Sequence, residues 1–125
     1  MPVFIEPNTL GDLLKYEASN LYSREAMTVS SGENLALGAV IGVRTSTGKV
    51  HALDPDATDG TEIAAGVLLQ AVDATSTDKP GLRLARHGIV ADHAVVWPAG
   101  ITDDQKSAAV AQLDKALSIL VRKGV

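Results

Sequence analysis

The stretch DPDATDGTEIAAGVLLQAVDAT, residues 54–75, joins an acidic turn to an almost uninterrupted apolar segment. Four acids lie within nine residues of its start, namely Asp54, Asp56, Asp59 and Glu62. Such a cluster has two interpretations: the acids hold a cation, or they keep a turn in water before the chain enters a core. The spacing of the acids distinguishes between them.

A calcium loop of the EF-hand type needs oxygen ligands at loop positions 1, 3 and 5, glycine at 6 and a bidentate Glu at 12. If Asp54 takes position 1, then Asp59 occupies position 6 and Ala65 occupies position 12. The spacing therefore disfavours calcium. It favours a turn, because Pro55 presets φ and Gly60 tolerates positive φ.

The composition narrows the possible classes of protein. A chain of 125 residues suits one domain. It has no cysteine, which excludes a thiol nucleophile and a cysteine-type zinc site. The net charge is −4 and no basic block occurs, so direct nucleic-acid binding is not expected. We also expect no secretory signal and no membrane association, because no apolar run approaches the ~20 residues of a membrane span.

Short strands separated by turn residues are predicted from residue 28 onward. They cover residues 39–44, 49–53, 63–72, 82–90, 94–98 and 118–122. The first two form a hairpin around Gly48. Residues 63–72 carry apolar side chains at both odd and even positions, which predicts a central strand covered on both faces. Gly66 is predicted to mark a bulge or a close backbone approach. Pro80 and Gly81 are predicted to close a loop.

One helix is well defined by its pattern. Thr102 is the expected N-cap, and Gln105 stands at the capping-box spacing. Val110, Leu113 and Leu117 share one face, and the helix is expected to end near Leu117. The predicted fold class is therefore mainly β with some α content: a small domain of short strands with one C-terminal amphipathic helix over an opening.

The N-terminal segment has a different composition. Residues 1–27 hold three of the four aromatic side chains and no clear strand alternation. A short helix with Thr9 as N-cap and an extended arm with apolar anchors describe it equally well. We predict an N-terminal arm over residues 1–27, flexible in the free protein, and a β-rich domain over residues 28–125.

No motif predicts catalysis, a metal or a cofactor. The histidines lack metal-ligand spacing, and the chain has neither a G-x-S-x-G elbow nor a P-loop. Trp97 is either a ligand-stacking residue or a partly buried anchor. A binding or structural protein without a cofactor is thus favoured over an enzyme. The alternatives are a small β-domain that binds a carbohydrate or other small ligand through Trp97, and a hydrolase that uses His51 or His93 with a turn aspartate.

Residues 38–75 resemble the lambda-type head decoration proteins of tailed bacteriophages. The D-G-(S/T)-x-x-A-x-G-(V/I)-L element of those proteins matches residues 59–68. The later W-P, T-x-x-x-K and apolar-tail motifs match Trp97-Pro98, residues 102–106 and residues 119–121. The order of these motifs extends the likeness over about residues 22–122. On this resemblance, the fold-defining turn and anchor residues are Asp59, Gly60, Gly66, Trp97 and Pro98.

The resemblance implies a β-clip-like domain that assembles as a homotrimer. Such a trimer binds the major capsid protein of a tailed phage at threefold sites on the outside of the expanded head and stabilises the head against the pressure of packaged DNA. The protein is then made in the bacterial host cytoplasm and located on the capsid surface of the virion. The arm orders against the capsid, and its predicted contact residues are Phe4, Ile5, Leu10, Leu13, Leu14 and Tyr16.

Overall fold

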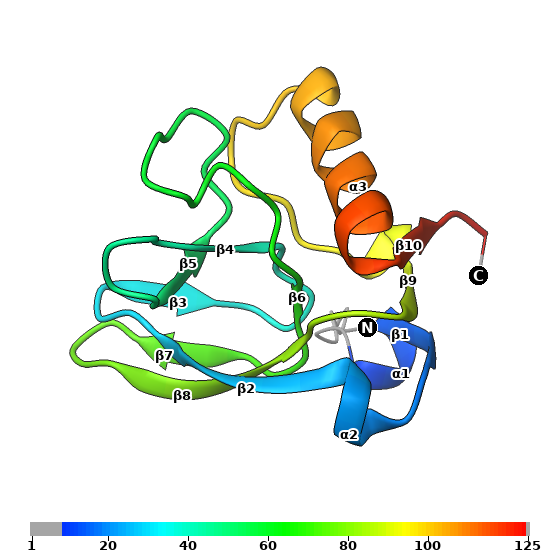
Figure 1. Cartoon of the computed structure of the whole chain (residues 1–125), viewed down its shortest axis with the longest axis horizontal. Helices are drawn as coiled ribbons and strands as arrows, with labels where there is room; N and C mark the ends of the chain where they lie inside the picture. The colour runs from blue at the N-terminus through cyan, green and yellow to red at the C-terminus, as the bar shows by residue number, and fades with distance from the viewer. Residues whose placement is uncertain (1–8, 125) are drawn as a thin grey trace, which may run out of the picture.

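The computed structural model describes residues 9–124 and is mainly β, with one helix longer than a single turn in that range (Figure 1). The strands are β1 (Leu14–Glu17), β2 (Arg24–Val29), β3 (Glu33–Leu35), β4 (Ile41–Val43), β5 (Val50–Ala52), β6 (Val67–Leu68), β7 (Val72–Ala74), β8 (Lys79–Leu84), β9 (Gly88–Ala91) and β10 (Ile119–Arg122). The helices are α1 (Leu10–Leu13), α2 (Asn20–Ser23) and α3 (Asp103–Leu117), with a 3-10 turn η1 at Asp92–Ala94. The predicted fold class is confirmed. No helix between residues 9 and 124 is long and apolar enough to cross a membrane.

The strands form three small sheets. Their orders are β4-β5-β2-β8-β6, β1-β9-β10 and β3-β7. The C-terminal strand β10 runs parallel to β9, whereas β1 runs antiparallel to β9 on its other side. The two edges of the five-stranded sheet are joined locally, because the Ile41 amide donates to the Gly66 carbonyl and the Leu68 amide donates to the Ala39 carbonyl.

Two apolar clusters form the interior. The larger one gathers side chains from α1, β6, β8, β9, β10 and α3, among them the fully buried Leu13, Leu84, Val90, Leu113 and Ile119. The smaller one fills the space between β2, β3, β4, β5 and β7. Because α3 and β10 both pack on the larger cluster, the burial of apolar area fixes where these elements lie relative to β9.

The structure of α3 follows its sequence signals. The Gln105 amide donates to Thr102 Oγ1 (3.1 Å) and the Thr102 amide donates to Gln105 Oε1 (3.0 Å), so the predicted capping box is confirmed. The helix ends at Leu117, where Ser118 adopts a left-handed conformation (φ 54°) and turns the chain into β10. The predicted last strand and the β4–β5 hairpin are also confirmed.

The predicted central strand over residues 63–72 is wrong. Only Val67–Leu68 forms a strand there, at one end of its sheet, and β7 begins separately at Val72. Gly66 has φ 141°, and a Cβ at this position would lie 2.6 Å from the Leu84 carbonyl oxygen. Ile63 stays 54% exposed. The chain therefore bends at Gly66, and the residues before it approach α3, where the Ala64 amide donates to Gln112 Oε1 (2.8 Å).

Three other strand boundaries also differ from the sequence pattern. Residues 82–90 are divided between β8 and β9, which belong to different sheets, because His87 has a positive φ of 54°. Pro80 and Gly81 lie inside β8 opposite Thr28 and Met27, not in a loop. Residues 94–98 contribute only an isolated bridge between Val96 and Ala39, and η1 precedes it.

The described part of the N-terminal segment, residues 9–27, packs on the rest of the chain. Thr9 caps α1 through a reciprocal pair of hydrogen bonds with Asp12. Leu13 is fully buried in the larger cluster, and β1 then pairs with β9. The flexibility of residues 1–27 in the free protein stays a prediction.

Candidate functional site

The acidic turn is held together by its own chain. Asp59 accepts hydrogen bonds from the amide (3.0 Å) and the hydroxyl (2.5 Å) of Thr61 and pairs with Arg44 (3.2 Å). Glu62 accepts from the Gly60 amide (2.8 Å). The hydroxyl and amide of Thr61, with the Arg44 guanidinium, lower the pKa of Asp59 to about 2. Hydrogen bonds and an ion pair within the chain therefore account for Asp59 and Glu62.

The remaining two acids of the turn are also bound internally. Asp54 Oδ1 accepts from the Asp56 amide (3.2 Å), and Asp56 Oδ1 accepts from Gln105 Nε2 of α3 (3.1 Å). Within residues 9–124, no group of three or more His, Asp or Glu side chains is arranged to hold a metal ion.

The histidines lie in three different settings. His51 is mostly buried and its Nδ1 lies 4.0 Å from Glu33 Oε2. His87 is exposed and its ring meets the edge of Tyr22 at a centroid distance of 5.1 Å. His93 is exposed in η1. The acid that pairs with His51 is thus Glu33 of β3, and Asp54 and Asp59 of the acidic turn line the same pocket.

The predicted capsid-contact residues fall into three groups. Phe4 and Ile5 lie outside the described residues. Leu13 is buried in the larger cluster, where Leu10 and Leu14 pack partly against it. Tyr16 is 60% exposed on β1. Capsid contact stays a prediction for all of these residues, and Leu13 makes such a contact only if it leaves the core.

An apolar row crosses the outer face of the three-stranded sheet. Tyr16 pairs with Ile89 of β9, and Ile89 pairs with Leu120 of β10, so the three side chains are neighbours on one face. They line a shallow groove of about 220 Å³ with Gly88 and Ser118. β1 is an edge strand, with β9 as its one partner strand among residues 9–124. Ile89 was not predicted, because only the pairing of β1 with β9 places it beside Tyr16.

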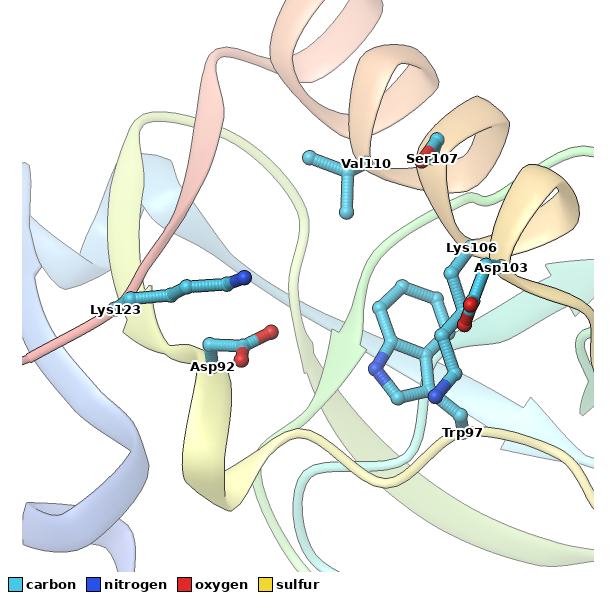
Figure 2. Close-up of a pocket in the computed structure, with 7 residues that line it drawn as sticks. All are labelled: Asp92, Trp97, Asp103, Lys106, Ser107, Val110 and Lys123. Atoms are coloured by element: carbon cyan, nitrogen blue, oxygen red, sulfur yellow. The ribbon is translucent and has the colours of Figure 1, made fainter.

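A second surface lies where η1, the segment before α3, the first turns of α3 and the end of β10 meet. It is a cleft of about 640 Å³ lined by Asp92, Trp97, Asp103, Lys106, Ser107, Val110 and Lys123. Figure 2 shows Asp92 and Lys123 facing the indole from one side, with Lys106 and Asp103 beside the ring. Trp97 is half-buried and packs against the larger cluster. The sequence indicated Trp97 alone, since the other lining residues are far apart along the chain.

A protein-family model described as bacteriophage lambda head decoration protein D matches residues 3–119 of the 125. A search of curated proteins finds no match.

Proposed function

We propose a function from one premise: this chain belongs to the bacteriophage lambda head decoration protein D family, whose model spans residues 3–119. Membership of this family implies that the protein has a structural role as a decoration of the phage capsid, on the virion. Within that role, we propose that the protein forms a β-clip homotrimer, made in the host cytoplasm, that attaches to the major capsid protein at threefold sites of the expanded head. The extent of the family match is the observation that carries this proposal.

The three-stranded sheet offers a docking surface suited to such a partner. Within residues 9–124, β1 has no partner strand on the side away from β9. An extended segment of a capsid protein pairs along that side, and added-strand pairing supplies affinity through main-chain hydrogen bonds. The row of Tyr16, Ile89 and Leu120 beside this edge supplies apolar contacts. The surface therefore combines the two elements that recognition by strand addition requires.

We propose that the N-terminal residues add capsid contacts beside this surface. Residues 1–8 lead directly to Thr9 and α1, next to β1, and carry Phe4 and Ile5. Ordering a segment costs ~1–2 kcal/mol per residue in backbone entropy, so a single segment binds weakly. Three segments on one trimer make the later contacts intramolecular, and avidity rises by roughly 10² to 10⁴. A trimer that bridges capsomers in this way opposes their separation under DNA pressure without making or breaking a covalent bond.

Deletion of residues 2–8 tests the proposal. Among residues 9–124, the side chains of both apolar clusters lie at Leu10 or beyond, and the deletion retains Thr9, which caps α1. We therefore expect the shortened protein to keep its fold and its trimeric state in a sedimentation experiment. The full chain should co-sediment with expanded heads and not with compact proheads, and the shortened chain should lose at least about tenfold in affinity.

Equal binding of the full chain to both forms of the head would argue against sites created by expansion. Undiminished affinity of the shortened chain would remove residues 2–8 from the mechanism. Tyr22→Ala is the matched control for Tyr16→Ala. Both tyrosines are exposed, but only Tyr16 lies on the proposed surface, so only Tyr16→Ala should weaken attachment.

A further inference from the structure

The cleft beside Trp97 has one aromatic wall and a polar rim. The indole is held in place because one part of it packs on the larger cluster, while the rest lines the cleft. The cleft volume of about 640 Å³ falls within the range of about 300–1,000 Å³ typical of small-molecule sites. A fixed aromatic face of this kind suits a flat, partly apolar ring.

The polar groups of the rim have no partner among the residues that the structure describes. The side chains of Asp92, Asp103, Lys106, Ser107 and Lys123 make no hydrogen bond or ion pair with any residue in the range 9–124. They come from η1, α3 and the chain just after β10, and Figure 2 shows Asp92 and Lys123 facing Trp97 across the cleft. Donors and acceptors thus converge on the space beside the indole without satisfying one another.

The charges of the rim select the class of ligand. Two carboxylates, Asp92 and Asp103, balance two ammonium groups, Lys106 and Lys123. The two carboxylates would repel a phosphate, and the two ammonium groups would repel a cation, so the rim suits neither kind of ion. A neutral sugar does match it, because each hydroxyl both donates and accepts: it can donate to a carboxylate and accept from an ammonium group.

We propose that this cleft binds a neutral hexose unit of a polysaccharide, with the ring on the indole of Trp97 and its hydroxyls on Asp92, Lys106 and Lys123. The inference goes beyond capsid decoration, because it gives a protein of the head surface an affinity for glycans. None of the residues that line the cleft belongs to β1, so substitutions can test the two activities separately.

Fluorescence titration of the full chain tests the inference directly, since Trp97 is the only tryptophan and therefore reports on this cleft alone. Glucose, galactose and mannose, and oligosaccharides of each, serve as probes. We expect a saturable change with at least one of the hexoses. Tighter binding of the oligosaccharide identifies a polysaccharide as the source, and equal binding identifies the free sugar, which would overturn the polysaccharide assignment.

Two substitutions and a matched control locate the binding. Asp92→Asn and Lys123→Met should each weaken the sugar by about tenfold, because each removes a charged hydrogen-bonding group. Lys115→Met makes the same change as Lys123→Met at an exposed position in the last turn of α3, outside the cleft, and should leave affinity unchanged. The proposal is overturned by the absence of a saturable response to every sugar, by a response to inorganic phosphate alone, or by unchanged affinity in both cleft variants. Because the assay uses free protein, these outcomes are independent of attachment to heads.

Discussion

The acidic turn and the Trp97 cleft both contain carboxylates, but these differ in whether the described chain hydrogen-bonds to them. In the turn, residues 54–62, each carboxylate accepts a hydrogen bond from the chain itself. In the cleft, Asp92 and Asp103 have no such partner among the described residues. Acids that are adjacent in sequence here stabilise a fold, whereas polar groups that only the fold brings together are left available to a ligand.

The largest effect that this comparison predicts is at Gly60. Its φ is 105°, and a Cβ would lie 2.4 Å from Thr45 Oγ1 and 2.6 Å from the Val43 carbonyl oxygen. Gly60→Ala should therefore lower the free energy of unfolding by about 2–4 kcal/mol, measured by urea denaturation.

Gly100→Ala, close to the cleft, is the matched control for Gly60→Ala. Gly100 also has a positive φ (78°), but no atom lies within 4 Å of a Cβ built there. Its loss should be limited to about 1–2 kcal/mol from the left-handed backbone conformation. Equal losses of stability for the two variants would show that the close approach of Thr45 and Val43 to Gly60 adds nothing to the effect of the substitution.

A smaller effect is predicted at Asp59, and it depends on pH. The Thr61 hydroxyl and amide, together with Arg44, hold the pKa of Asp59 at about 2, below its ordinary value of 3.8. The ionised form is thus favoured in the folded state, so its stabilisation is complete above about pH 4 and is lost as the pH falls toward 2.

Melting temperatures of the wild type and Asp59→Ala across this pH range measure the effect. The wild type should melt higher at neutral pH, and the gap should close toward pH 2. A gap that stays constant between pH 7 and pH 2 would contradict the role of the ionised carboxylate.

The sequence predicted those features whose determinants are local. The capping box of α3 and the β4–β5 hairpin depend on residues a few positions apart, and both were confirmed. The close backbone approach at Gly66 was also predicted and is confirmed, since a Cβ there would lie 2.6 Å from the Leu84 carbonyl oxygen. The positive φ of His87, which separates β8 from β9, was not predicted, because no local pattern marks it. The cleft depends on residues 92–123, which only the packing of α3 and β10 on the larger cluster brings together, so no motif marked it.

The smallest effects on stability are predicted in the cleft. Asp92→Asn, Lys106→Met and Lys123→Met change side chains that have no hydrogen-bond or ion-pair partner among residues 9–124, so each should change the free energy of unfolding by no more than about 0.5 kcal/mol. Urea denaturation checks this. Losses as large as that of Gly60→Ala would show that the cleft residues stabilise the fold, and the contrast between the two regions would disappear.

Cryo-electron microscopy of expanded phage heads mixed with the purified protein tests the capsid-decorating account most directly. The account predicts protruding density with threefold symmetry on the outer surface of the head, into which three copies of this chain fit with the β1 edge toward the shell. Bare heads under saturating protein, or single copies bound away from the threefold positions, would contradict it.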